Sequence, residues 1–290
     1  MAFIKSLAFD GGNDYVNVPD DASLDITNNL SVVAWCECGS QSSGETIIAK
    51  YYASTNNRSW ILYVGSGSQK LRCIVSDDGT WHADHTKDYE TIANVLTSGW
   101  HQIGFTFASG TLKIYVDGTE ITSLTKTLDA VGMTTIKSGS AACILGAHSG
   151  FGSSYWTGEI CNCSVWSTTC LSPTDISNLY NSGNASDPGT LSTSATLVSS
   201  WLWNETLTYD TIPDNTGSNT GTMANMASGD IVDSPFINVI DPDYVCPQAL
   251  QAISPQRWLV GGDVDSTAIE DLGEQHNTMV SAYLSGGHRS

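Results

Sequence analysis

Residues 100–118, WHQIGFTFASGTLKIYVDG, contain two apolar runs that meet at a Ser-Gly pair and end at Asp-Gly. Aromatic and β-branched residues favour extended backbone, and a tight Gly-containing turn joins antiparallel strands. The stretch therefore predicts a β-hairpin formed by residues 100–108 and 112–116. Similar short runs bounded by turn residues recur at residues 30–38, 46–51, 60–64, 71–76, 142–146, 158–166 and 197–202.

The N-terminal residues 4–18 predict another hairpin, turning at a Gly-Gly-Asn centre. One segment predicts a helix, because Ser172 can cap it, Pro173 suits its first turn and Gly183 follows its end. Many short strands with almost no helix indicate an all-β fold in which two antiparallel sheets form a sandwich.

The charge is strongly acidic: 30 Asp and Glu face 11 Lys and Arg in 290 residues, a net charge of −19. Such a chain repels nucleic-acid phosphates and anionic lipid, so we expect neither nucleic-acid binding nor membrane insertion. The N-terminus enters a strand pattern directly, without the apolar core of a signal peptide. We therefore expect synthesis in a cytoplasm.

Two cysteine pairs, Cys36/Cys38 and Cys161/Cys163, are spaced two residues apart within apolar runs. Alternate residues of a strand share one face, so each pair points to the same side. We expect buried core thiols. Disulfides between neighbouring strands remain an alternative, and zinc fits less well because structural zinc sites use a longer cysteine spacing.

The regular pattern of apolar strand segments ends after residue 236. This change predicts a division into a sandwich (1–236) and an extended C-terminal arm (237–290). The arm contains Pro242, Pro247 and Pro255 and is too thin in apolar residues for a core of its own. We expect it to serve attachment or oligomerisation, with disorder as the alternative. The candidate interface residues are its isolated apolar anchors, Tyr244, Leu250, Trp258, Leu259 and Val260.

Several phrases, in the right order, resemble the laminin-G-like jelly-roll family of concanavalin A-like sandwiches. They are SLAFDGGNDYV (6–16), LSVVAW (30–35), IIAK (47–50), WHQI (100–103), LKIYVDG (112–118), GEI (158–160) with VW (165–166), and LS (171–172) with LYNSG (179–183). The resemblance covers residues 4–183 and implies a jelly-roll sandwich.

A second resemblance concerns residues 197–201, 213–226 and 230–232, which are similar to a module of tail and virion proteins of marine bacteriophages. It implies a structural virion surface protein, decorating a capsid or associated with a tail or fibre, and located in the virion. Its partners would be other virion proteins. By analogy a homotrimer is expected.

Calcium is a possible cofactor by resemblance, since proteins of this fold often carry an acidic residue after the closing Gly-x-Ile. This chain has Cys161 and Asn162 there. Asp10 and Asp14, which flank a Gly-rich turn, remain candidate calcium ligands, and the alternative is that both stabilise the turn.

Catalysis is not expected. Glycosidases of related folds use two carboxylates on one strand face. The nearest acidic cluster, residues 270–274, lies in the arm and lacks that geometry. The His-rich residues 81–85 predict a solvated loop rather than a metal site.

Glycan binding is the other function that the sequence suggests, because sugar sites use aromatic platforms beside polar loops. The candidates are Tyr52, Trp60, Trp81, Tyr155 and Trp156, each with the alternative of a core position. Two functions result: a non-enzymatic virion protein that adheres to host-surface glycan, or a free-standing lectin-like module.

Overall fold

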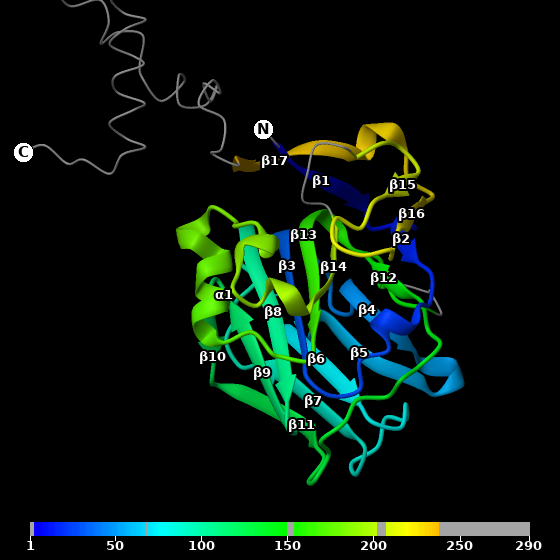
Figure 1. The fold of residues 1–290 in the computed structure, drawn as a ribbon, viewed down its shortest axis with the longest axis vertical. Helices are drawn as coiled ribbons and strands as arrows, with labels where there is room; N and C mark the ends of the chain where they lie inside the picture. Colours follow the sequence, from blue (N-terminus) through cyan, green and yellow to red (C-terminus); the bar gives the residue numbers. More distant parts are fainter. Residues whose placement is uncertain (1–2, 68, 150–153, 202–206, 238–290) are drawn as a thin grey trace, which may run out of the picture. The chain divides into compact units, whose positions relative to one another are not determined.

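The structure, a computed structural model, describes residues 3–67, 69–149, 154–201 and 207–237. The predicted all-β sandwich is confirmed: two antiparallel sheets pack face to face (Figure 1). The described residues fall within one compact unit of the chain, Met1–Asp241. The predicted arm beyond residue 237, with its five interface candidates, lies outside the described residues.

Sheet A has seven strands in one path and an eighth, β14, that pairs with β13. In spatial order the path is β10 (Thr119–Ile121), β9 (Thr111–Val116), β8 (Gly99–Ala108), β3 (Leu30–Cys38), β13 (Thr157–Ser167), β1 (Phe3–Asp10) and β17 (Ile231–Ile237), and β14 is Leu197–Trp201.

Sheet B has nine strands. In spatial order they are β11 (Leu124–Asp129), β7 (Thr86–Thr91), β6 (Leu71–Ser76), β5 (Asn57–Val64), β4 (Thr46–Tyr52), β12 (Cys143–Leu145), β2 (Tyr15–Val18), β16 (Gly221–Ala224) and β15 (Thr211–Ile212).

The helical elements of the described chain are short: α1 (Pro173–Tyr180) and the 3-10 turns η1 (Ala22–Leu24), η2 (Ala53–Thr55), η3 (Asn181–Gly183), η4 (Pro188–Thr190), η5 (Ser194–Thr196) and η6 (Ser228–Asp230). The predicted helix is confirmed. Ser172 Oγ accepts from Asp175 N–H at 3.1 Å, and the Asp175 carboxylate accepts from Ser172 N–H at 2.9 Å. Among the described residues no helix is long and apolar enough to cross a membrane.

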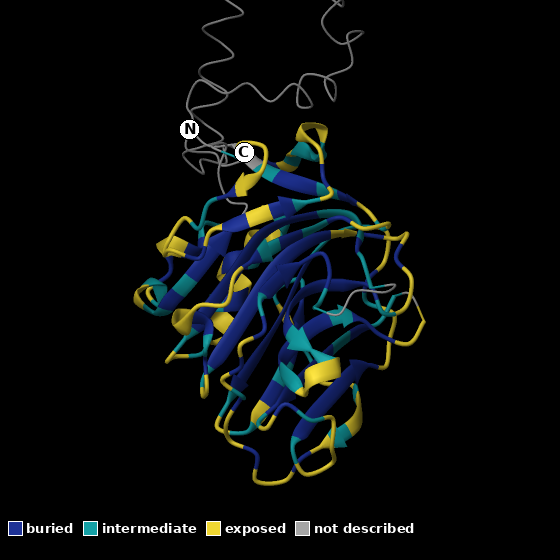
Figure 2. Cartoon of the chain, turned by 90° about the vertical axis from the view of Figure 1, so that its right-hand side faces the viewer, coloured by how far each residue is buried: buried dark blue, intermediate teal, exposed yellow. Residues whose placement is uncertain are grey.

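The main core lies between the two sheets and is filled by alternate residues of the strands. Trp60, Leu62 and Val64 of β5 face it, and so do Ala34 and Cys36 of β3. Figure 2 shows the buried residues concentrated on the strands and the exposed ones on the connecting loops. Because the strand period is two, the residues between these point to the outer faces of the sandwich.

The predicted central hairpin is confirmed as β8 and β9, with Ala108 opposite Thr111. Ser109 and Gly110 have φ of 47° and 79°, the left-handed backbone that a tight two-residue hairpin turn requires. Gly tolerates this conformation without steric cost, which explains the Ser-Gly pair at this position.

The predicted N-terminal hairpin is wrong. β1 pairs with β13 and β17 in sheet A, whereas β2 pairs with β12 and β16 in sheet B. The Gly-rich turn therefore carries the chain from one sheet to the other. Phe9 and Val16 are both buried in the core, so the two strands face each other across it instead of sharing a ladder.

The core-thiol prediction is confirmed for the pairs Cys36/Cys38 and Cys161/Cys163, and all the described cysteines are free. Burial raises the pKa of Cys163 and Cys161 well above the ordinary thiol value. The cysteines that are fully enclosed are Cys36, Cys38, Cys73, Cys143, Cys161 and Cys163.

Residues 197–237 contribute strands to both sheets and do not form a separate body. Phe236 of β17 packs against Trp35 and Trp100, with ring centroids 4.4 Å and 5.1 Å away. The sandwich thus extends to the last described residues.

Candidate functional site

The outer face of sheet B has an apolar floor. Ala49, Ile61 and Ile74 lie side by side on β4, β5 and β6 and form a cluster separate from the main core. Ile61 points outward because its neighbours Trp60 and Leu62 point inward. An apolar floor on the outside of a sheet is a surface suited to a ligand.

An open pocket of about 170 Å³ lies on this floor. Its walls are the half-buried rings of Tyr51 and Tyr63, and the lining residues are Gly44, Tyr51, Ile61, Tyr63, Ile74, His148 and Ser154. Pockets that enclose drug-sized ligands measure roughly 300–1,000 Å³. This pocket is large enough only for a single ring-sized group.

Arg58 holds one wall of the pocket in place. Its Nε donates to Tyr51 Oη at 3.2 Å, and its guanidinium lies 5.7 Å from the Tyr51 ring centroid. The His148 ring packs edge-on against the same tyrosine, 5.9 Å between centroids. Burial raises the pKa of Tyr51 despite the nearby Arg58 charge, so its hydroxyl stays protonated and can donate or accept.

Arg72 fixes the other wall through a bidentate ion pair. Its Nε and Nη2 donate to the two carboxylate oxygens of Asp88 at 2.7 and 2.5 Å, and its guanidinium lies 5.6 Å from the Tyr63 ring centroid. The hydrogen bonds to Asp88 raise the pKa of Arg72, and burial raises the pKa of Tyr63. The pair is rigid and charge-assisted.

Trp81 extends the site toward solvent. Its Nε1 donates to the same Asp88 carboxylate at 3.3 Å, while 52% of the residue is exposed. An indole held at one edge and open elsewhere can stack against a ligand ring. Trp81, Asp88 and Arg72 thus link the pocket to an exposed platform.

Two carboxylates, Asp88 and Glu90, share the outer face of β7. Residues 81–85, predicted to be a loop, lie outside the strands, and β7 begins directly after them and pairs with both β6 and β11. Asp88 is bound by Arg72, and Glu90 accepts from Ser66 N–H at 2.7 Å and from its hydroxyl at 2.5 Å. Both carboxylates are buried and engaged in structural bonds, unlike the pair of a glycosidase.

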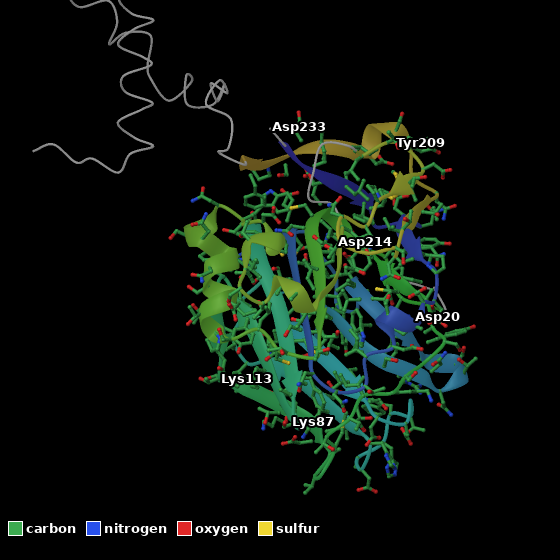
Figure 3. The ribbon with its side chains drawn as sticks, viewed as in Figure 1. Asp20, Lys87, Lys113, Tyr209, Asp214 and Asp233 are labelled. Atoms are coloured by element: carbon green, nitrogen blue, oxygen red, sulfur yellow. The ribbon has the colours of Figure 1, made fainter. Side chains whose placement is uncertain are left out.

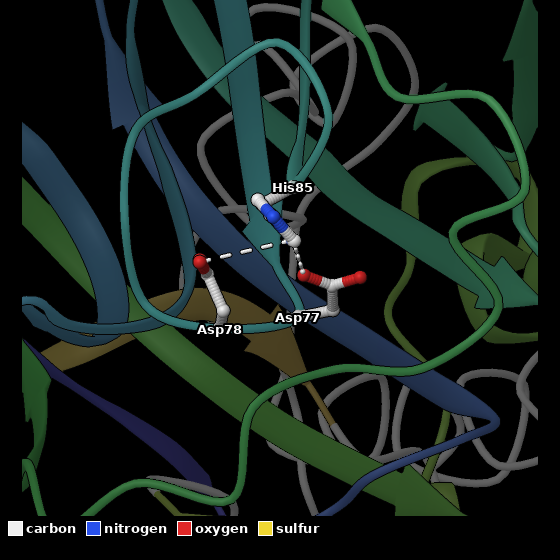
Figure 4. Close-up of side chains that lie close together, drawn as sticks. All are labelled: Asp77, Asp78 and His85. Carbon is white, nitrogen blue, oxygen red and sulfur yellow. Dashed lines mark hydrogen bonds and ion pairs between the residues drawn. The ribbon is translucent and has the colours of Figure 1, made fainter.

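Asp77, Asp78 and His85 form a group that could offer ligand atoms to a metal ion, shown in Figure 4. His85 Nδ1 lies 2.8 Å from Asp77 Oδ1 and 3.7 Å from Asp78 Oδ2. The hydrogen bond to Asp77 raises the pKa of His85 above its ordinary value. The three side chains form a local ion-pair network at the turn between β6 and β7.

The calcium candidates, Asp10 and Asp14, are used by their own turn. Asp10 Oδ1 accepts from Gly12 N–H at 2.7 Å, and Asp14 Oδ2 accepts from Asp10 N–H at 3.1 Å. Burial raises the pKa of Asp14 above its ordinary value. These contacts fit the turn-stabilising alternative.

The aromatic candidates separate into core and surface. Trp60 and Trp156 are 1% and 0% exposed, so the prediction that they bind sugar is wrong: both fill the core between the sheets. Tyr52 and Tyr155 are half-buried, outside the pocket lining. Trp81 lies next to the site, and the sequence interpretation missed Tyr63, Arg72 and Asp88.

Strand parity could have found these missed residues. Once Trp60 is assigned to the core, Ile61 and Tyr63 must face outward. Arg72 lies directly opposite Tyr63, and Asp88 lies opposite Ile74. What parity alone does not provide is the pairing of β5 with β6 and of β6 with β7.

The chain is thus a two-sheet β-sandwich with an aromatic pocket on the outer face of sheet B. The chain belongs to the concanavalin A-like lectin/glucanases superfamily, whose laminin-G-type sequence profile matches residues 10–177. No curated protein sequence matches it.

The chain is similar to several solved structures. A protein from Bacteroides ovatus assigned as a carbohydrate binding protein is similar with a TM-score of 0.59 at 18% identity, covering 82% of this chain but only 62% of its own. The heptameric SAP-like pentraxin of Limulus polyphemus has a TM-score of 0.45 at 14% identity, with 75% and 94% covered. Domain 4 of the extracellular arabinanase of Geobacillus stearothermophilus, in complex with arabinotriose, has a TM-score of 0.43 at 19% identity, with 59% and 74% covered.

Proposed function

We propose that this chain is a glycan-binding module and that the outer face of sheet B holds the sugar. The observation that carries the proposal is the pocket between Tyr51 and Tyr63, floored by Ile61 and Ile74. Sugar rings present apolar C–H faces and polar edges, so they suit aromatic walls with fixed hydrogen-bond partners nearby. Membership of a superfamily that contains lectins agrees with this function.

The polar groups around the pocket would orient the ligand. Trp81 offers an exposed stacking surface, and the bidentate Arg72–Asp88 pair keeps its supporting carboxylate in place. A site whose side chains are already held in position loses less entropy when a ligand binds. We therefore expect micromolar-to-millimolar binding to the exposed part of a polysaccharide.

The test is a glycan array followed by titration of the best ligand with Trp81→Ala. We expect at least a tenfold loss of affinity, with the melting temperature unchanged. Tyr209→Ala is the matched control, because Tyr209 is 54% exposed on another part of the domain (Figure 3). Equal effects of the two substitutions, or no retained glycan at all, would contradict the proposal.

The same proposal treats the module as non-enzymatic. The buried, engaged state of Asp88 and Glu90 supports this. Incubation of the bound polysaccharide with the protein should release no new reducing ends. Release that disappears in Glu90→Gln would instead identify a glycosidase of this superfamily.

A second part of the proposal concerns location. The similarity of residues 197–232 to virion modules supports a surface role on a bacteriophage particle, with residues 238–290 as the attachment segment. Mass photometry of the full chain beside a chain ending at residue 237 tests it. A defined oligomer that becomes a folded monomer on shortening supports an assembly role; two identical monomers favour a free-standing module.

A further inference from the structure

The basic side chains of this acidic protein are almost all paired. Nine of its lysines and arginines are described, and seven have a carboxylate oxygen within 4 Å. The paired residues are Lys5, Lys50, Lys70, Arg72, Lys87, Lys113 and Lys126. Within the described part of the chain, only Arg58 and Lys137 lack such a partner.

These two unpaired cations meet at one residue. Arg58 Nη1 donates to Gly79 O at 2.9 Å. A Cβ added at Gly79 would lie 2.6 Å from Lys137 Cδ, so the lysine stem packs against the same glycine. Gly79 also has a φ of +89°, which favours glycine here for a second reason. The fold therefore brings two basic side chains without a carboxylate partner to one loop.

The hydrogen-bond partners of Arg58 are all neutral. Its donors reach Tyr51 Oη at 3.2 Å, Asn56 Oδ1 at 2.8 Å and Gly79 O at 2.9 Å. These bonds use Nε and Nη1, and the described residues provide no acceptor for Nη2. The bonds orient the guanidinium without neutralising it.

The acidic residues next to Gly79 in the sequence are engaged elsewhere. Asp78 Oδ1 accepts from Thr80 N–H and from its hydroxyl, both at 2.7 Å. Asp77 pairs with His85. Their carboxylates therefore do not take the place of a partner for Arg58.

We propose that Arg58 and Lys137 form an anion subsite beside the pocket, so that the preferred glycan is acidic, with a carboxylate or sulfate ester on the sugar. This inference rests on the proposed glycan function. Arg58 connects the two parts, because the tyrosine that it holds is also a wall of the pocket. A ring seated against Tyr51 would place an acidic substituent at the guanidinium.

The overall charge makes this subsite selective. A chain of net charge −19 repels a polyanion at long range, and salt at about 0.15 M screens that repulsion beyond about 8 Å. A charge-assisted contact to Arg58 acts at much shorter distance and survives screening better. Binding of an acidic glycan should therefore persist at physiological salt and depend on these two residues.

The experiment compares polysaccharides that share a backbone but differ in charge: dextran with dextran sulfate, and polygalacturonate with its methyl ester. We expect the acidic member of at least one pair to bind at least tenfold more tightly. Arg58→Gln and Lys137→Gln should each remove most of that preference, and Arg58→Lys should keep part of it. Lys113→Gln is the control, because it removes the same charge from a residue paired with Glu120 on sheet A.

Sulfate alone separates this inference from the glycan function. Titration of inorganic sulfate should shift the ¹⁵N–¹H signal of Arg58 Nε saturably, and Lys137→Gln should weaken the effect. Equal binding of neutral and acidic polysaccharides would overturn the anion subsite and leave the glycan function intact. A saturable sulfate effect with no glycan bound would support the subsite and overturn the glycan function. The inference would be overturned if sulfate shifted no signal and if Arg58→Gln and Lys137→Gln bound acidic polysaccharides as tightly as the native protein.

Discussion

His101 and Asp117 close the open end of the central hairpin: His101 Nδ1 lies 2.8 Å from Asp117 Oδ2. The other oxygen of the same carboxylate accepts from Gln102 N–H at 3.0 Å, and Asp117 N–H donates to Gln102 O at 2.8 Å. The Asp that ends the second strand is thus tied to the start of the first. This contact gives the hairpin a dependence on pH.

His101→Gln should change how stability depends on pH. The hydrogen bond to Asp117 raises the pKa of His101 above its ordinary value of 6.5. A raised folded-state pKa gives stability that is full below 6.5 and disappears as the pH rises through the folded-state value. We expect the native protein to exceed the variant by about 0.5–1 kcal/mol in acid and to lose this advantage in alkali.

Urea unfolding at several pH values measures this difference. If the difference in unfolding free energy between the two proteins stayed constant from pH 5 to pH 9, the ion pair would contribute nothing to the pH dependence of stability.

How far the sequence predicts this molecule depends on which physical signal carries each feature. The β8–β9 hairpin and the α1 cap are local, because a turn pair and a capping box act within a few residues. The Gly-Gly turn near residue 12 led to the wrong prediction of a hairpin, because a local turn signal does not say which sheet each strand joins. That assignment depends on partners more than 100 residues away, such as β13 for β1.

The candidate site was harder to predict for the same reason. Trp60 carries the residue type of a sugar platform, but strand parity places it in the core. Tyr63 and Asp88 come together only through the pairing of β5, β6 and β7. The type of a residue predicts which ligand it could bind. Its position in the paired strands decides whether its side chain faces the core or the surface, and so whether a ligand can reach it.

Lys50→Ala should be strongly destabilising, although lysine is a residue type usually found on protein surfaces. Lys50 is fully buried, and its Nζ bonds Asp20 Oδ1 at 2.5 Å and Ala141 O at 2.8 Å. Truncation leaves a buried carbonyl without its donor and a void where the stem packed, a loss of about 3 kcal/mol. Urea unfolding measures it.

Lys113→Ala is the control for this prediction, and Figure 3 labels both Lys113 and Asp20. Its side chain is 39% exposed in a pair with Glu120, so the change should cost less than about 1 kcal/mol. Similar losses in both variants would mean that Lys50 contributes no more than a surface ion pair.

Thiol reactivity should follow unfolding rather than exposure to oxidant. Burial raises the pKa of Cys143 to about 12, and Cys36, Cys73 and Cys161 are shifted upward for the same reason. Thiolates are the reactive form, and burial also shields all six of these thiols from a reagent, so they should resist Ellman's reagent in the native protein. Mass spectrometry after pulsed labelling should find them modified only at urea concentrations that unfold the domain. Rapid native labelling of any of these six would contradict this core.

Phe236→Ala should show that the last described strand belongs to the sandwich. Phe236 is 6% exposed and its ring lies 4.4 Å from that of Trp35, so truncation should cost about 3 kcal/mol. Val131→Ala is the control, since Val131 is 97% exposed and should change stability by less than about 0.5 kcal/mol. Thermal unfolding measures the stability of both variants. Tryptophan fluorescence can follow it, because Trp35 and Trp100 both contact the Phe236 ring.

A chain that ends at residue 230 lacks β17 and should unfold at least as easily as Phe236→Ala. If it were as stable as the full chain, β17 would be an appendage, and the sandwich would end at β16.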